Sequence, residues 1–216
     1  FRYDRAMDAD TTMTVQGEAY THPTAMESVQ VPVAGADRQF QQVENDDTVN
    51  GGHLLYRMVR GFGAPAGWRL RTYYDRTRRD TARFGVERDT LDFDFRRWQH
   101  WGERNDLMWG AEYLWTRDHV DNGPVLFMDP DKRAWSQANL FVQNTTTLVP
   151  DRWFLMLGSK FTWHGFAGYA AQPNLRLWWT PTSDQTLWFS VSRPVRFPSR
   201  FEEDGQVGLG MLRTAL

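Results

Sequence analysis

Two side chains whose types and spacing could support chemistry are Asp92 and Asp94. Alternate residues of a β-strand point to the same face, so these carboxylates would lie side by side if the segment were a strand. Neighbouring carboxylates can act as general acid and general base, which would activate water for a hydrolysis. Strand alternation by itself also requires polar residues at these two positions, so the pair has a plain structural interpretation. The histidines available to join the pair are His53, His100, His119 and His164.

Other kinds of reactive or metal-binding site are not indicated. The chain has no cysteine, which removes disulfides and cysteine-based zinc or iron–sulfur sites. The histidines lack the spacing of metal ligands, and Asp129-Pro130-Asp131 lacks the spacing of a calcium loop. The glycines between Gly205 and Gly210 lack the Lys-Ser/Thr that completes a phosphate loop. We therefore expect no enzyme activity, no catalytic residue, no metal and no cofactor.

The charge is nearly balanced, with 25 Lys+Arg against 27 Asp+Glu in 216 residues. Such a balance lacks the broad positive field of a dedicated nucleic-acid binder. Disorder is not expected, because the chain contains 11 Trp, 7 Tyr and 14 Phe and can bury a large apolar surface. Lys132 and Lys160 are the only lysines, so nearly all the positive charge is arginine. Arginine suits bidentate pairing with carboxylates inside a polar cavity.

The elements that would position these side chains are strands, because apolar and polar residues alternate with a period of two. The clearest example places Trp68, Leu70, Thr72 and Tyr74 on one face and Arg69, Arg71, Tyr73 and Asp75 on the other. Helical periodicity is absent over any comparable length. The sequence therefore predicts an all-β protein. The same alternation recurs in segments 91–96, 107–116, 138–143, 153–163, 173–180 and 187–192.

Turns and loops are expected between these segments. Pro150-Asp151 and residues 181–184 are typical of tight turns. Longer connections are expected at residues 23–47, an extended polar loop, and at residues 118–133, a loop rich in Asp, Gly and Pro. Weaker strand patterns lie on either side of the first loop. The sum is roughly nine strands of about ten residues each, joined alternately by short turns and by longer loops.

The length of these strands favours a membrane barrel. About ten residues is more than the five to six usual in globular proteins, and is the length that a tilted strand needs to cross a bilayer. The aromatics near the strand ends resemble the girdles of outer-membrane barrels, while charged residues stand in mid-strand on the opposite face. An antiparallel transmembrane β-barrel is predicted, and a soluble sandwich or propeller with a charged outer face is the alternative. The expected lipid-interface aromatics are Trp68, Tyr74, Trp109, Trp115, Trp153, Trp163 and Trp179.

Several stretches between about residues 67 and 203 resemble, in the expected order, the barrel of TonB-dependent outer-membrane receptors. Earlier strands of that barrel resemble Tyr73-Tyr-Asp-Arg76, Asp89-Thr-Leu-Asp-Phe-Asp-Phe95 and Trp109-Gly-Ala-Glu-Tyr113. The middle region resembles Asn139-Leu-Phe-Val-Gln-Asn144, Leu148-Val-Pro-Asp-Arg-Trp153 and Leu157-Gly-Ser-Lys-Phe161. The last matching stretches are Gln172-Pro-Asn-Leu-Arg-Leu-Trp-Trp-Thr-Pro181 and Thr186-Leu-Trp-Phe-Ser-Val-Ser-Arg-Pro-Val-Arg-Phe-Pro-Ser199.

This resemblance implies that residues 1–216 form a partial outer-membrane β-barrel domain. A complete barrel of the family has about 22 strands, so about nine would be an incomplete, mid-barrel part. No stretch matches the family's plug domain or its energy-coupling box. The opening residues also lack the basic and apolar regions of a secretory signal. We therefore expect the plug domain and the signal peptide to be absent from this chain.

The function implied by the resemblance is energy-coupled uptake of a scarce nutrient complex, such as a ferric siderophore, across the outer membrane of a Gram-negative bacterium. The ligand would be a metal chelate or a similar small molecule. The barrel would contact outer-membrane lipid, and an inner-membrane energy-coupling protein would act through the missing plug; no nucleic acid is expected. The polar face would line the lumen, with the residues Arg69, Arg71, Asp92, Asp94, Arg96, Glu112, Lys160 and Arg176.

Two alternatives stay open at the level of sequence. A self-contained outer-membrane porin or adhesion barrel would pair its first and last strands and would fold alone in detergent. An outer-membrane protease would use Asp92 and Asp94 together with a histidine at the barrel rim.

Overall fold

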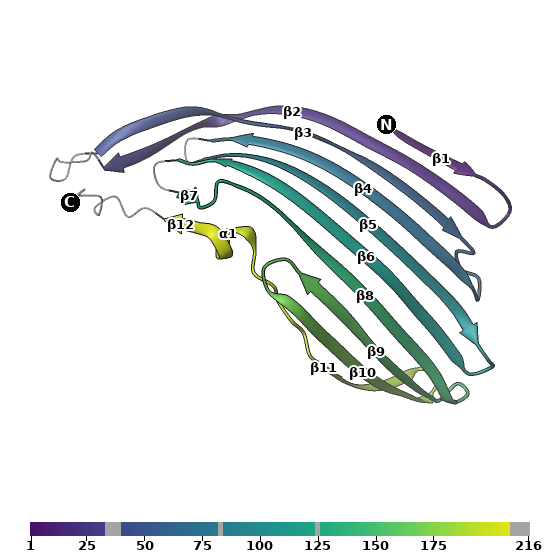
Figure 1. Cartoon of the computed structure of the whole chain (residues 1–216). Coiled ribbons are helices and arrows are strands. Elements are labelled where there is room, and N and C mark those ends of the chain that lie inside the picture. Colours follow the sequence, from purple (N-terminus) through teal and green to yellow (C-terminus); the bar gives the residue numbers. More distant parts are fainter. Residues whose placement is uncertain (33–39, 82–83, 124–125, 208–216) are drawn as a thin grey trace.

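The structure is a computed structural model, which describes residues 1–32, 40–81, 84–123 and 126–207. Ten antiparallel strands form one sheet, ordered along the chain without a crossover. Figure 1 shows that this sheet is curved into an arch. No helix within the described ranges is long and apolar enough to cross a membrane. The strands of the sheet are β1 (Arg2–Ala6), β2 (Thr11–Pro32), β3 (Phe40–Arg60), β4 (Gly67–Asp80), β5 (Gly85–Trp101), β6 (Asn105–Asp121), β8 (Lys132–Val149), β9 (Trp153–His164), β10 (Gly168–Thr182) and β11 (Gln185–Ser192).

The sheet is open in the part of the chain that the structure describes, because β1 and β11 lie at its two edges and do not pair with each other. The prediction of an all-β antiparallel sheet is confirmed, and so is its incompleteness as a barrel. Ten strands replace the nine expected, since the short β1 was not recognised. The strands are also longer than predicted, with 22 residues in β2 and 17 in β6.

A second, small group of elements lies on the hollow side of the arch (Figure 1). Strand β7 (Leu126–Met128) pairs with β12 (Gly205–Val207), and the single-turn helix α1 (Arg200–Asp204) directly precedes β12. Ser199 caps α1 through a capping box with Glu202. The chain after β11 therefore turns back over the sheet and ends its described part beside the connection from β6 to β8.

The strand register keeps the apolar and polar faces continuous across the sheet. One polar row runs from Arg71 through Asp94, Glu112 and Asn139 to Thr162. The adjacent apolar row includes Leu70, Phe95, Ala111, Leu140 and Phe161, each paired with the next. Since successive residues of a strand face opposite sides, these two rows lie on opposite faces of the sheet.

The sheet has almost no hydrophobic core of its own. Among the described residues, Val120 is the one hydrophobic side chain that is buried, whereas Asp94, Asp118, Asn139 and Thr162 are buried polar side chains. A soluble sheet has to bury its apolar face against a second layer. No second layer covers the apolar face in the described part of the chain. In a soluble sandwich, by contrast, the apolar face is buried and the polar face is exposed.

The expected long loop at residues 23–47 is wrong. Strands β2 and β3 continue through most of it and pair from Pro23–Thr48 to Pro32–Phe40, with a register shift between Pro23 and Met26. The remainder, residues 33–39, lies outside the described residues. The prolines and the lack of alternation indicated a loop, but backbone hydrogen bonds between two neighbouring strands do not require one apolar face.

The expected loop at residues 118–133 is correct only at its centre. Strand β6 runs to Asp121 and β8 begins at Lys132, so the predicted loop was too long at both ends. Within it, β7 pairs with the distant β12, which no local pattern indicates. The tight turn at Pro150-Asp151 is confirmed: Asp151 has a φ of 59°, and the Arg152 amide donates to the Val149 carbonyl at 3.1 Å.

The expected alternation of short and long connections is wrong as stated. At the end of the sheet with the long β2–β3 hairpin, residues 165–167 between β9 and β10 also form a tight connection. Instead, the strands differ in length. The last residue of β4 that pairs with β3 is Asp80, opposite Thr48, whereas β2 and β3 continue to pair with each other beyond this point.

Candidate functional site

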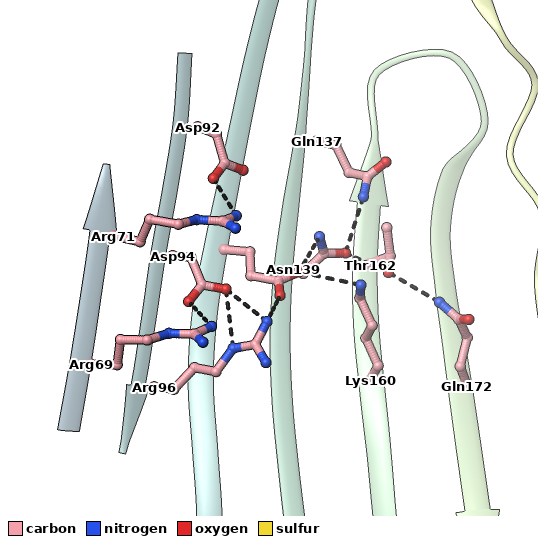
Figure 2. A network of polar contacts seen from close by, with 11 residues as sticks. Arg69, Arg71, Asp92, Asp94, Arg96, Gln137, Asn139, Lys160, Thr162 and Gln172 are labelled. Atoms are coloured by element: carbon pink, nitrogen blue, oxygen red, sulfur yellow. Dashed lines mark hydrogen bonds and ion pairs between the residues drawn. The ribbon is translucent and has the colours of Figure 1, made fainter. Parts of the chain in front are cut away.

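The hollow side of the sheet carries a network of charged and polar side chains (Figure 2). Its sidedness follows from α1, which lies on the hollow side and whose Arg200 contacts Asp118 of the polar face. The predicted lumen-facing residues are on this face by register. Whether this face lines a lumen stays a prediction, but the geometry brings most of these side chains into contact with one another.

Asp94 of β5 is the centre of the network. Its carboxylate accepts from Arg69 of β4 at 3.0 Å and from Arg96 of its own strand at 2.9 Å. Arg96 also donates to Glu112 of β6 at 3.0 Å, and Lys160 of β9 donates to the same carboxylate at 3.3 Å. Five of the predicted residues therefore form one chain of ion pairs that crosses four strands and skips β8.

The burial of Asp94 makes this arrangement costly to disturb. Its side chain is only 1% exposed, whereas those of Arg69 and Arg96 are 33% and 38% exposed. A carboxylate removed from water needs opposite charges and hydrogen bonds to remain ionised, and both arginines supply them. Asp94 therefore has a clear structural role.

The remaining predicted residues are held differently. Arg71 pairs with Asp92 at 2.7 Å, beside the Asp94 cluster. Arg176 of β10 lies apart from both groups, and its guanidinium sits 5.9 Å from the centre of the Trp188 ring. Across the network, the four cations Arg69, Arg71, Arg96 and Lys160 face the three carboxylates Asp92, Asp94 and Glu112. One positive charge is thus in excess.

The network extends through amides and a hydroxyl that the sequence analysis missed. Asn139 of β8 donates to Glu112 at 3.2 Å and accepts from Thr162 of β9 at 2.7 Å. Gln172 of β10 donates to the Thr162 hydroxyl at 3.2 Å. Each of these residues belongs to the polar set of its strand. Their positions in the alternation, on the polar side of each strand, could have identified them, although they carry no charge.

Phe141 explains why the alternation in β8 is less clean than elsewhere. It lies on the polar face and pairs with Gly110 of β6. A Cβ atom at Gly110 would stand 2.7 Å from the Phe141 ring and 2.3 Å from the Phe95 carbonyl oxygen, so only glycine fits there. The ring in turn lies 5.6 Å below the Arg96 guanidinium. One aromatic residue on the polar face therefore helps to position a central arginine.

A second buried cluster joins α1 to the polar face. Arg200 is 4% exposed and donates to Asp118 of β6 at 3.1 Å, to Asp204 and to the Pro130 carbonyl. Arg133 of β8 also pairs with Asp204. We call Arg200, Asp118, Asp204 and Arg133 the Arg200 cluster. Asp204 is a local partner of Arg200, four residues along the chain, but nothing in the local sequence indicates Asp118, which is 82 residues away.

The segment leading to α1 has further contacts with the polar face. The Phe197 ring stacks on His164 of β9, with 4.9 Å between ring centres and 8° between planes. The Val195 amide donates to the Gln172 side chain at 3.4 Å. Residues 193–207 therefore pass from β11 across β10 and β9 to β6 and β8, on the same side of the sheet as the Asp94 network.

The opposite face carries the aromatics predicted for a lipid interface. By register, Tyr74, Leu91 and Trp115 form one row near one end of the sheet. Trp68 and Trp109 lie near the other end, where each contacts the Phe95 ring, at 6.5 and 5.7 Å between centres. The remaining three of the set lie on the same face by register, where Trp163 pairs with Ala138 and Trp153 stacks on Trp179 at 5.3 Å.

The apolar surface between these aromatics forms a band. On β6 it runs from Leu107 to Trp115, with five apolar side chains at alternate positions. Eight residue steps span about 27 Å along a strand, close to the band of about 25 Å on outer-membrane barrels. Above Trp115 the same face becomes charged, with the row Arg76, Asp89 and Arg117.

The histidines do not join the paired aspartates. Asp92 and Asp94 face arginines, while His100 pairs with Asp106 and His164 stacks on Phe197. His119 lies 3.6 Å from Asp121, on the charged outer row. Within the described ranges, no three His, Asp or Glu side chains gather as a metal site. The arrangement of Asp92 and Asp94 with a histidine that the protease alternative requires is therefore not formed by these residues.

The sequence matches no protein-family model and no curated protein sequence. Its structure is similar to the siderophore receptor PirA from Pseudomonas aeruginosa, with a TM-score of 0.61 and 13% identity over 91% of this chain. It is also similar to the siderophore receptor PirA from Acinetobacter baumannii, with a TM-score of 0.65 and 13% identity over 88% of this chain. The fold is that of part of a siderophore-receptor barrel. The chain spans 32% of the length of each receptor chain.

This likeness confirms, at the level of the fold, the resemblance drawn from the sequence. The structural likeness covers about nine-tenths of this chain in both comparisons, although the sequences differ at most positions. A strand pattern with one apolar and one polar face tolerates such divergence, because many residue types satisfy each face.

Proposed function

We propose that this chain forms part of the wall of an outer-membrane receptor that imports a siderophore or a similar metal chelate into a Gram-negative bacterium. The observation that carries the proposal is the likeness of the fold to two siderophore receptors over about 90% of the chain. Uptake would depend on energy from an inner-membrane protein of the TonB type, acting through a plug domain, as the sequence resemblance implies.

The two faces of the sheet support this assignment. The outer face has an apolar band limited by aromatic residues, which suits contact with lipid. The hollow face has hydrogen-bonded charges, which suits a hydrated lumen next to another domain or a ligand. Spanning strands also have to satisfy their backbone groups within the sheet, and the antiparallel pairing of each strand with the next from β2 to β10 does so.

The excess positive charge of the Asp94 network supports an anionic cargo. Four cations face three carboxylates there, and the Nε atoms of Arg69 and Arg71 are buried without a hydrogen-bond partner among the described residues. A lumen with this balance favours the passage of negatively charged chelates over cations. We therefore propose that the imported chelate carries a net negative charge.

Iron-limited uptake tests the proposed function. The bacterium that carries the gene is compared with a deletion strain and with the deletion strain complemented by the complete gene, using ferric siderophores labelled with radioactive iron. We expect uptake of at least one siderophore to fall to background in the deletion strain and to return on complementation. A protonophore should abolish the complemented uptake, because the transport requires energy.

The same experiment separates a receptor from a porin. A porin would pass small solutes without energy, so its transport would persist in the protonophore. A self-contained barrel also requires its edge strands to pair, whereas β1 and β11 lie at opposite edges of the sheet in the described chain. Uptake unchanged by deletion, for every siderophore tested, would contradict the proposed function.

A further inference from the structure

A polar cavity of about 310 Å³ lies on the outer face of the sheet, next to the charged end of the apolar band. Its volume is at the lower end of the range of about 300–1,000 Å³ that is usual for small-molecule sites. We call it the rim cavity. It is lined by Arg76, Glu87, Asp89, Arg117, Asp118, His119 and Lys132.

The position of the rim cavity follows from the register. The pairs Arg76–Asp89 and Asp89–Arg117 form the row directly above Tyr74, Leu91 and Trp115, two residues along each strand. Glu87, His119 and Lys132 form the next row. The cavity therefore begins one row beyond the aromatic limit of the apolar band. In a bilayer, this is the level of the lipid headgroups.

The carboxylates of the rim cavity already have partners. Glu87 pairs with Arg78 at 3.0 Å, and Asp89 accepts from the Tyr74 hydroxyl at 2.7 Å. Arg76 lies between the two carboxylates, at 3.7 Å from Glu87 and 3.9 Å from Asp89. Glu87 and Asp89 are therefore engaged by residues of β4, and the third carboxylate of the lining, Asp118, is held by Arg200 at 3.1 Å.

Arg117 and Lys132 are the cations left over. Neither has an ion pair with another residue in the part of the chain that the structure describes, and both side chains are exposed. Lys132 pairs with His119, two residues from Arg117 on β6, so the two cations are diagonal neighbours on one face. His119 itself lies 3.6 Å from Asp121 and 3.9 Å from Asp131.

We propose that the rim cavity binds the phosphate group of a membrane lipid through Arg117 and Lys132. An arginine guanidinium can hold two phosphate oxygens at once, and a lysine ammonium adds a point charge. The acyl chains of such a lipid would lie along the apolar band below, against Tyr74 and Trp115. This inference rests on the proposed function, because it requires the outer face to contact a bilayer.

A lipid retention assay tests the inference. The protein is expressed from its complete gene, purified in dodecyl maltoside and titrated with phosphatidylglycerol, and the retained lipid is measured by mass spectrometry. We expect the double variant R117Q/K132Q to bind about 30-fold more weakly, since each cation near a membrane surface contributes about 1 kcal/mol. The control R78Q, matched in charge to the single variant K132Q, removes one positive charge from the same face, but one already paired with Glu87, and should change binding less than twofold.

Two further ligands identify the chemistry. Diacylglycerol lacks the phosphate, so we expect it to bind the wild-type protein no more tightly than it binds the double variant. Inorganic phosphate at millimolar concentration should not displace phosphatidylglycerol, because the acyl chains contribute to binding. Displacement by inorganic phosphate would assign the rim cavity to free phosphate and overturn the lipid inference. Equal loss of lipid in R78Q and in the single variant K132Q, each of which removes one positive charge, would also overturn it, since any cation would then serve.

Cell fractionation separates this inference from the proposed function. Absence of the protein from the outer membrane would contradict both. A protein that is embedded there and takes up siderophore, but whose double variant retains lipid as the wild type does, would contradict the rim cavity alone. The single variant K132Q, with an expected loss of about fivefold, keeps the test valid if the double variant folds poorly.

Discussion

The Asp94 network and the Arg200 cluster both hold a buried carboxylate with arginine, yet they are built in different ways. Asp94 pairs with Arg69, 25 residues away on the neighbouring strand, and with Arg96 on its own strand. Asp118 pairs with Arg200, which is 82 residues away and reaches it from outside the sheet. The first cluster follows from the register of adjacent strands, whereas the second requires a segment to return across five strands.

This difference predicts different consequences when each cluster is broken. The partners in the Asp94 network are also joined by backbone hydrogen bonds of the sheet, so their loss should weaken the sheet as a whole. The Arg200 cluster holds residues 193–207 against the polar face, so its loss should release that segment and leave the sheet folded.

The largest effect is expected from R200M. The substitution removes the arginine that donates to Asp118, which is 2% exposed, and leaves Arg88 at 4.0 Å from its carboxylate. Loss of one partner from a buried pair costs about 3–5 kcal/mol. We expect hydrogen exchange of residues 193–207 to accelerate more than 100-fold, with the urea midpoint of the sheet unchanged. The control R196M removes an exposed arginine that pairs with Glu202, and should leave exchange of β12 as in the wild type. Global unfolding by R200M would erase the distinction between the two clusters.

A smaller but global effect is expected from D94N. The side chain keeps its shape but no longer balances Arg69 and Arg96, which are each about one-third exposed and therefore partly solvated. We expect a loss of about 2–3 kcal/mol in the free energy of unfolding, below the range for fully buried pairs. Tryptophan fluorescence during urea unfolding in detergent measures it. Faster exchange confined to β4 and β5, with an unchanged midpoint, would show that this cluster also acts locally.

The neighbouring pair Arg71–Asp92 provides a graded comparison. Its side chains are 40% and 22% exposed, so solvent screens the interaction and D92N should cost about 1 kcal/mol or less in the same urea experiment. The two aspartates stand two residues apart on one strand and differ in burial and in the number of arginine partners, since Asp94 has two and Asp92 has one. An equal loss in D92N and D94N would show that neither burial nor the second arginine determines the energy of this network.

The smallest effect concerns pH and the helix beside Arg200. The Ser199 backbone N–H donates to the Glu202 carboxylate at 2.9 Å, and this hydrogen bond lowers the pKa of Glu202 below its ordinary value. A carboxyl group with a lowered pKa stabilises the fold fully above its ordinary value of about 4.3, and this stabilisation is lost as the pH falls through the lower, folded-state pKa.

Hydrogen exchange of α1, corrected for intrinsic rates, should therefore accelerate as the pH is lowered from 6 to 3. E202Q should remove most of this pH dependence, because glutamine does not titrate. A pH dependence in E202Q equal to that of the wild type would mean that another group controls the helix. The carboxylates of the Arg200 cluster would then be the next to test.

The polar face could be predicted from the sequence to a large extent. Arg69, Arg71, Asp92 and Asp94 alternate with apolar residues, and strand geometry alone places them together on one face. Asn139 and Thr162 were missed because uncharged polar residues are weak indicators of a polar network, although both occupy polar-face positions in the alternation of their strands. Phe141 weakened the pattern in β8, and only its packing against Gly110 accounts for it.

Two regions resisted prediction for a common reason. The sequence of the outer half of the β2–β3 hairpin carries no period-two pattern, even though the backbones of the two strands pair. Strand β7 is three residues long and exists through its pairing with β12, about 80 positions later. Neither feature has a local signal, because each depends on a partner strand and on nothing in its own side-chain alternation.

The sequence by itself determined the class of the fold and the two faces of the sheet, since alternation is a local property of the pleated backbone. Tertiary structure decided which arginine meets which carboxylate, because strand register sets those pairs. It also decided the return of residues 193–207 onto Asp118, and the gathering of Arg117 and Lys132 in one cavity at the edge of the apolar band. These features arise from contacts between residues far apart in the chain, whose geometry no local pattern contains.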